Sequence, residues 1–252
     1  MKRLLRFVFA VMLVVNGAFA KQYRDFTDTK GRTIRGYVQA FDERSGRVTF
    51  ERENHRTSKV PITIFSEADQ TYIQEWNHAK FFLSKSSFKI SASRKKMKDK
   101  GESYSGVAWS KKVKNMGYEV VFENRSATQL ENLEIKYCIF YEQDDVKDRR
   151  TQCTEEGVLC GNFPLNSLPP KCKKSLMTEM VKIFKKELGG DYYYTEDIKN
   201  VQSGQIRGIW IRVSMKLSSG EKLTRDYCLP DSLENSKVWM ASSINVGMNK
   251  ID

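Results

Sequence analysis

Few residues of this chain could perform catalysis. His55 and His78 are the two imidazoles in 252 residues, and neither has an acidic and a nucleophilic partner at a catalytic spacing. Ser-x-x-Lys occurs at Ser86 and Ser93, but the companion Lys-Thr-Gly of penicillin-recognising enzymes is missing. Nucleophile-elbow, zinc-protease and phosphate-loop motifs are missing as well. We therefore expect a protein that binds rather than catalyses, with neither metal nor cofactor.

The five cysteines fit disulfide chemistry better than metal binding. Three of them lie in a polar, proline-containing stretch that is typical of a loop, and a bridge among these is the preferred hypothesis: Cys153, Cys160 and Cys172. Cys138 lies in an apolar run expected to form a buried strand, where it can act as a small hydrophobic residue. The spacing of the three loop cysteines fits no common zinc pattern. Because the number is odd, at least one thiol stays free or pairs between molecules.

The first twenty residues resemble an export signal. Lys2, Arg3 and Arg6 precede an apolar run from residue 7 to 15, and Ala18-Phe19-Ala20 has the form of a cleavage site. The apolar run is too short to span a bilayer, so no transmembrane anchor is expected. Cleavage after Ala20 removes three basic residues and lowers the net charge from +12 to +9. We expect an exported protein, periplasmic or secreted, for which nucleic acid is an unlikely partner.

The mature chain begins with short strands and one helix. Turn-separated alternating segments predict strands over residues 23–28, 32–41, 47–53 and 58–62. Ser66-Glu67-Ala68-Asp69 has the form of a helix N-terminus, and apolar residues then recur at helical spacing through Ala79. This order predicts a small barrel closed by a helix, which we assign to residues 21–83.

Four segments of this region resemble the SLA-type homology domain family (SHD). They are an aromatic-x-Asp opening from Tyr23, a Gly-x-Val strand at Gly46, a Val-Pro strand at Val60, and the helix start from Ser66 to Tyr72. The resemblance covers residues 23–76 and implies an SH3-like fold. In eukaryotic adaptors it implies binding of short peptide motifs in cytoskeletal, clathrin-linked and ubiquitin-linked assemblies.

The chain departs from the family pattern at two positions. His55 stands where glycine often follows the asparagine of the second turn, and Phe65 replaces leucine before Ser66. The basic residues that flank this turn, Arg52, Arg56 and Lys59, are the candidate contacts for an acidic group of a peptide. The alternative is that they only keep the surface charged and soluble.

A Ser/Lys segment at residues 84–87 is the predicted linker to a second domain, residues 88–252. Alternating segments there predict about seven strands of a β-sandwich of immunoglobulin or fibronectin type: residues 88–92, 104–113, 117–123, 133–141, 191–201, 205–217 and 221–229. Between the fourth and fifth lies an insertion, residues 142–190, in which apolar residues at helical spacing predict an amphipathic helix over 174–188. The expected fold is mostly β with a helical insertion.

A basic stripe with aromatic residues supplies the alternative function. This composition can bind a polyanion or an envelope polysaccharide. The stripe has Tyr104 and Trp109 interleaved with the basic residues Arg94, Lys95, Lys96, Lys98, Lys100, Lys111, Lys112 and Lys114. The leading hypothesis is an exported adaptor that recognises a protein or peptide of unknown identity through the SHD-type domain. The competing hypothesis is binding of an envelope polymer by the second domain.

Overall fold

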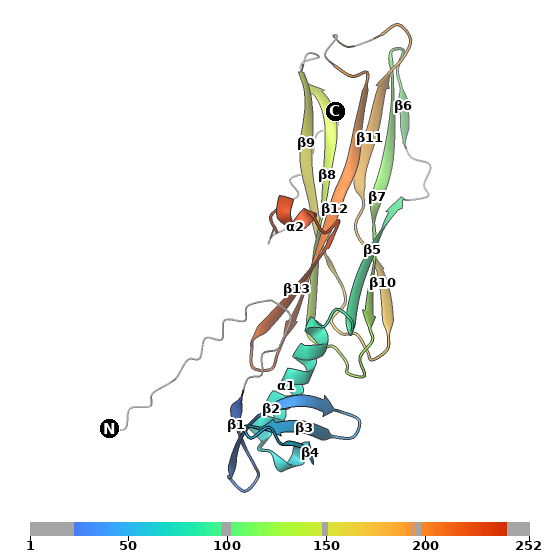
Figure 1. The fold of residues 1–252 in the computed structure, drawn as a ribbon. Helices are drawn as coiled ribbons and strands as arrows, with labels where there is room; N and C mark the ends of the chain where they lie inside the picture. Colours follow the sequence, from blue (N-terminus) through green and yellow to red (C-terminus); the bar gives the residue numbers. More distant parts are fainter. Residues whose placement is uncertain (1–22, 97–101, 148–150, 193, 195–197, 241–252) are drawn as a thin grey trace, which may run out of the picture. The chain divides into compact units, whose positions relative to one another are not determined.

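The computed structural model describes residues 23–96, 102–147, 151–192, 194 and 198–240 (Figure 1). Contacts divide the chain after Ile73, inside helix α1 (Glu67–Leu83), into a small and a large unit. The predicted linker, residues 84–87, forms the turn that follows this helix. The last part of the helix contributes Ala79 and Phe82 to the core of the large unit. The first part of α1 therefore belongs to the small unit and the last part to the large unit.

The small unit is an antiparallel four-stranded sheet in the order β1-β2-β3-β4. Its elements are β1 (Arg24–Thr27), β2 (Thr33–Asp42), β3 (Arg47–Arg52), β4 (Thr57–Pro61) and the 3₁₀ turn η1 (Ile62–Ile64). Alternation along the strands gives the sheet one apolar face, which buries Phe26, Val38, Val48 and Phe50. Phe65 and Ile73, from the chain that follows, complete this core.

The start of α1 is fixed to β1 by Asp69. Its carboxylate, 6% exposed, accepts hydrogen bonds from Arg24 Nη2 at 2.8 Å, from the Thr27 backbone N–H at 2.7 Å and from Ser66 Oγ at 3.0 Å. Ser66 Oγ in turn accepts from the Asp69 N–H, as a helix cap does. The Arg24 guanidinium lies 3.8 Å from the ring centre of Tyr72. The residues most specific to the family resemblance therefore hold strand and helix together.

The large unit is a single nine-stranded sheet, so the chain is mostly β as predicted. β5 (Phe88–Lys96), β6 (Ser103–Ser105), β7 (Trp109–Asn124), β10 (Lys173–Met177) and β11 (Val181–Leu188) form one arm. β8 (Leu133–Lys147), β9 (Thr151–Phe163), β12 (Val201–Lys216) and β13 (Lys222–Leu229) form the other. The short helix α2 (Leu233–Ser236) follows β13.

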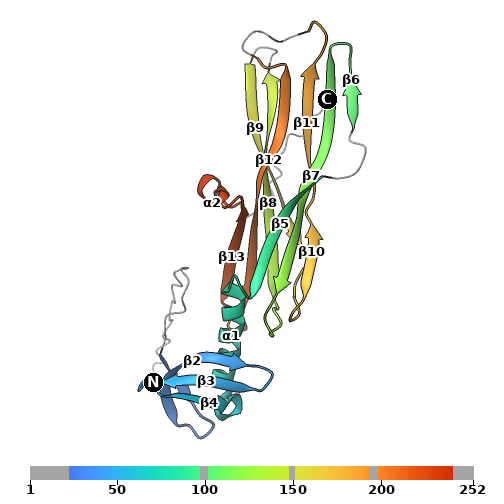
Figure 2. The ribbon, with the colours of Figure 1, turned by 45° about the vertical axis from the view of Figure 1, so that its right-hand side comes forward.

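The two arms are joined where Lys185–Glu187 of β11 pair with residues 201–203 of β12. Elsewhere they pack through side chains, as in a sandwich: Phe122 of β7 contacts Phe163 of β9 with ring centres 5.6 Å apart. The shared core draws on both arms and includes Phe88, Ile90, Tyr118, Ile135, Ile139, Ile211 and Val213. Figures 1 and 2 show β9 at the outer edge of its arm.

The helix predicted over residues 174–188 is wrong. This segment forms the strands β10 and β11, which pair with residues 119–123 and 109–116 of β7. Val181 and Ile183 alternate with exposed neighbours and are buried against the sheet. β-branched residues favour strands, and the pairing with β7 decides between the two periodicities. The strands expected at 104–113 and 117–123 are largely one continuous β7, and the described residues of 191–200 lie outside strands.

No helix of the described ranges is long and apolar enough to cross a bilayer.

Candidate functional site

The β3–β4 turn carries two of the predicted peptide contacts, Arg52 and Arg56. The Arg52 N–H donates to the Arg56 carbonyl at 3.0 Å, and the His55 N–H donates to the Arg52 carbonyl at 2.9 Å. His55 closes the turn at φ 62°, in the left-handed region that glycine adopts most easily. This conformation explains why glycine is common there in the family that the region resembles. Both arginines are exposed at the two ends of the turn.

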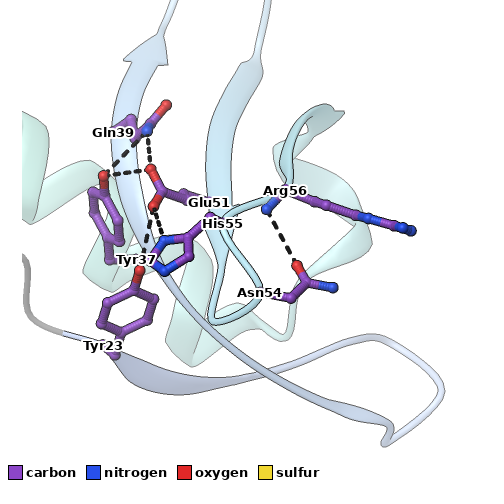
Figure 3. A network of polar contacts seen from close by, with 7 residues as sticks. All are labelled: Tyr23, Tyr37, Gln39, Glu51, Asn54, His55 and Arg56. Carbon is purple, nitrogen blue, oxygen red and sulfur yellow. Dashed lines mark hydrogen bonds and ion pairs between the residues drawn. The ribbon is translucent and has the colours of Figure 1, made fainter.

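A buried carboxylate supports this turn from the polar face of the sheet (Figure 3). The Glu51 side chain is 8% exposed and accepts hydrogen bonds from Tyr37 Oη at 2.7 Å, from Tyr23 Oη at 3.3 Å and from the Gln39 amide. His55 Nδ1 lies 3.2 Å from its Oε1. A carboxylate is stable at this depth because several donors replace water. Glu51 could not be singled out from the sequence, because the residues that donate hydrogen bonds to it come from three separate segments of the chain.

Lys59 does not join the two arginines. It lies on β4 opposite Thr49, and its carbonyl accepts a hydrogen bond from Arg47 Nη2 at 2.9 Å. Within the described residues, Arg52, Arg56 and Lys59 form no ion pair. The cations at the turn are therefore available to an external anionic group.

The second predicted surface is only partly assembled. Tyr104 of β6 lies opposite Lys111 of β7, two residues beyond Trp109. Both aromatic residues are partly exposed, and a hydrogen bond to Glu102 raises the pKa of the Tyr104 hydroxyl. In contrast, Arg94, Lys95 and Lys96 pair with residues 116–118, further along β7. Lys95 also contacts Glu119 at 3.0 Å, so these three do not form one site with the aromatics.

The structure instead places lysines of β11 beside those of β7. Lys111 is the direct cross-strand partner of Lys186, and Lys112 is the partner of Lys185. Like charges directly opposite each other destabilise a sheet. Because side chains alternate between the faces of a strand, the Lys111–Lys186 pair lies on the face of Tyr104 and Trp109, and the Lys112–Lys185 pair lies on the other face. Among the described residues, Lys111, Lys112 and Lys186 form no ion pair, whereas Lys185 contacts Glu187 at 2.9 Å. These pairs could not be found from the sequence, because the β11 lysines were assigned to a helix. Lys98 and Lys100 of the predicted stripe lie outside the described residues.

The predicted disulfide among Cys153, Cys160 and Cys172 is wrong, because Cys160 pairs outside this group. Cys160 pairs with Cys138, its direct partner across β8 and β9, with the Cα atoms 4.1 Å apart. The stretch expected to be a loop is the strand β9, and this places Cys160 opposite a residue that was interpreted only as packing. Cys153, Cys172 and Cys228 are free thiols. Cys138 is followed across the sheet by Trp210 of β12 and then by Cys228 of β13, so three cysteines and a tryptophan form one cross-strand row.

Comparison with known proteins adds no family. No protein-family model matches the chain, and no curated protein matches it. Twenty-four chains of solved structures match. One is the X-ray structure of Northeast Structural Genomics Consortium target SoR45, which is 10% identical with a TM-score of 0.26, over 57% of this chain and 86% of that chain. A likeness of this size carries no argument about fold or function, so the residues themselves must support any proposal.

Proposed function

We propose that this chain is an exported, non-enzymatic binding protein whose small unit recognises a protein or peptide partner. The SHD resemblance of residues 23–76 motivates the class of function. The observation that carries the proposal is the β3–β4 turn, where Arg52 and Arg56 are exposed and form no ion pair within the part of the chain that the structure describes. The ligand feature that matches them is a carboxylate or another anionic group, because arginine binds such groups in a bidentate manner.

The small unit supports this use because the buried Glu51 carboxylate fixes the position of the turn. Glu51 connects the turn residue His55 with Tyr37 of the neighbouring strand. A positioned turn loses less conformational entropy on binding than a mobile one. The residues that define the family resemblance most closely, Ser66, Asp69 and Tyr72, contact β1 instead. Specificity would therefore come from the turn and not from the motif.

The experiment compares partner capture by charge-reversed variants of the full chain. Arg52→Glu with Arg56→Glu should lose partners that the wild type retains from an envelope extract, as quantified by mass spectrometry. Lys30→Glu with Arg44→Glu changes the charge of the same unit by the same amount at other turns, and should retain them. Equal capture by both double variants would remove the basis of the proposal. Export is checked separately, because the N-terminus of the purified mature protein should be Lys21.

A second candidate is polyanion binding by the lysine pairs of β7 and β11. One like-charged cross-strand pair, Lys111–Lys186, shares a face of the sheet with the partly exposed Tyr104 and Trp109, and the other, Lys112–Lys185, lies on the opposite face. A polyanion bound on the aromatic face would relieve the repulsion between Lys111 and Lys186. Lys111→Gln with Lys186→Gln should lower the salt concentration that elutes the protein from heparin. Lys89→Gln with Lys222→Gln, equal in charge, should have a smaller effect. The same elution for both double variants would count against this candidate.

A further inference from the structure

The outer edge of β9 differs from the other strand edges in the large unit. β9 pairs with β8 along all thirteen of its residues without a register shift. Among the described residues, no backbone–backbone hydrogen bond joins residues Thr151 to Asn162 of β9 to any segment other than β8. It contains no proline, lysine or arginine. The other edge strands, β5, β10 and β13, contain lysine or arginine, and β6 has only three residues. Such charges or short lengths protect an edge from pairing; β9 is long, and its only charged residues are Glu155 and Glu156.

The disulfide shows which backbone groups of β9 face outward. Directly opposed residues in antiparallel strands are about 4.5 Å apart when they do not exchange hydrogen bonds, and about 5.5 Å apart when they do. The Cα atoms of Cys138 and Cys160 are 4.1 Å apart, so Cys160 belongs to the first kind. The N–H and C=O groups of Cys160 therefore point away from β8. By alternation, those of Thr154, Glu156 and Val158 do so as well.

The side chains along this edge indicate the partner's chemistry. Carboxylates outnumber cations on the half of the β8–β9 pair that ends at Lys147 and Thr151. They are Glu142, Asp144, Asp145, Glu155 and Glu156, of which Glu142 pairs with Arg207 and Glu156 pairs with Lys237. A cavity of about 290 Å³ lies beside Val158, between these strands and the segment from Ser236 to Met240. Val238 and Met240 in its lining are exposed apolar side chains. A strand added here would meet a pocket whose lining is mostly apolar but includes Arg207 and Lys237, and then a region of net negative charge.

We infer that the β9 edge binds an extended segment of a partner protein as an additional strand, with an aliphatic side chain at the Val158 cavity and basic side chains toward the carboxylates. Main-chain hydrogen bonds supply affinity in this mode, and side-chain pockets supply specificity. A second copy paired through its own β9 is disfavoured, because the acidic edges would repel each other. This site is independent of the arginine turn in the small unit.

The test uses the full chain and a fluorescein-labelled synthetic peptide of roughly nine residues. Every second residue of the peptide faces the Val158 side of the sheet; these positions carry valine at the end over the cavity and lysine at the end over Glu142 and Asp144, with threonine between them. We expect saturable binding by anisotropy and slower amide exchange at Thr154, Glu156 and Val158. The same peptide with glutamate in place of lysine should bind at least about tenfold more weakly. A peptide N-methylated at the amides on the side facing β9 should lose binding.

Two protein variants separate the backbone from the side chain. Thr154→Pro removes an outward N–H, which an edge strand tolerates, whereas Thr154→Val keeps the N–H and loses only the hydroxyl. We expect at least about tenfold weaker binding for the proline variant alone, and unchanged binding for Arg52→Glu with Arg56→Glu. Absent binding, equal binding of the lysine and glutamate peptides, or equal binding of the N-methylated peptide would overturn the inference. Protection of these amides by raised protein concentration alone would assign the edge to a second copy instead.

Discussion

The attachment of α1 to β1 through Asp69 gives the sharpest test of the small unit. Asp69→Asn keeps the size of the side chain and one acceptor oxygen, but removes the charge that binds Arg24 at 2.8 Å. Removing one partner of a buried ion pair costs about 3–5 kcal/mol. Because Arg24 is 34% exposed and regains water, we expect the lower end, about 3 kcal/mol. At 1.4 kcal/mol per factor of ten, this corresponds to roughly 150-fold faster amide exchange.

Hydrogen exchange with mass spectrometry on the full chain measures this loss, because protected amides of β1 to β3 report opening of the small unit. The matched control is Asp25→Asn. The Asp25 side chain is 61% exposed and lies 3.8 Å from Arg35, so its exchange should change by no more than about threefold. The amides of β8 and β12 provide an internal reference in the large unit. If Asp69→Asn accelerated exchange less than about tenfold, or no more than Asp25→Asn does, the Arg24–Asp69 ion pair would not hold β1 and α1 together as described.

Three further predictions concern the large unit. Replacing both Cys138 and Cys160 by alanine opens a loop with a sequence separation of 22, and should lower the free energy of unfolding by about 3 kcal/mol in urea titration; an unchanged midpoint would contradict this. Burial raises the pKa of the Cys228 thiol to about 12, so iodoacetamide at pH 8 should modify the exposed Cys172 and spare Cys228 until the protein is denatured. Hydrogen bonds, first from Lys136 and then from Lys222, lower the pKa of the Glu134 carboxyl from 4.5 to about 2. The contribution of Glu134 to stability is therefore present above pH 4.5 and is lost as the pH falls toward 2. An NMR titration in which the Glu134 carboxyl titrates near pH 4.5 would contradict the lowered pKa.

Local patterns predicted the first helix, the strands of the small unit and the strands β8, β12 and β13 of the large unit, but not β9, β10 or β11. Alternation located β2, β3 and β8, since each strand has one buried face, and Ser66 with Asp69 marked the start of α1. The segment over 174–188 could not be decided locally. Its apolar residues fit both a helical and a strand spacing, and pairing with β7 selected the strand.

Which residues come together in the candidate sites depends more on the register between paired strands than on the composition of each segment. Cys138 and Cys160 are 22 positions apart in sequence, and only the alignment of β8 with β9 makes them partners. The same holds for Lys112 and Lys185, which come from two segments that were assigned to different kinds of structure. Arg52 and Arg56, by contrast, were found correctly at one turn because a hairpin keeps sequence neighbours together.

The cross-strand row described above has an optical consequence. Trp210 has the disulfide-bonded Cys138 as its direct neighbour on one side and Cys228 on the other. An excited indole readily gives an electron to an adjacent disulfide, so Trp210 should emit weakly while the bridge is intact. Reduction of the Cys138–Cys160 bond should then restore its emission. The chain therefore carries an internal fluorescent reporter of its own redox state, which can be read without any added label.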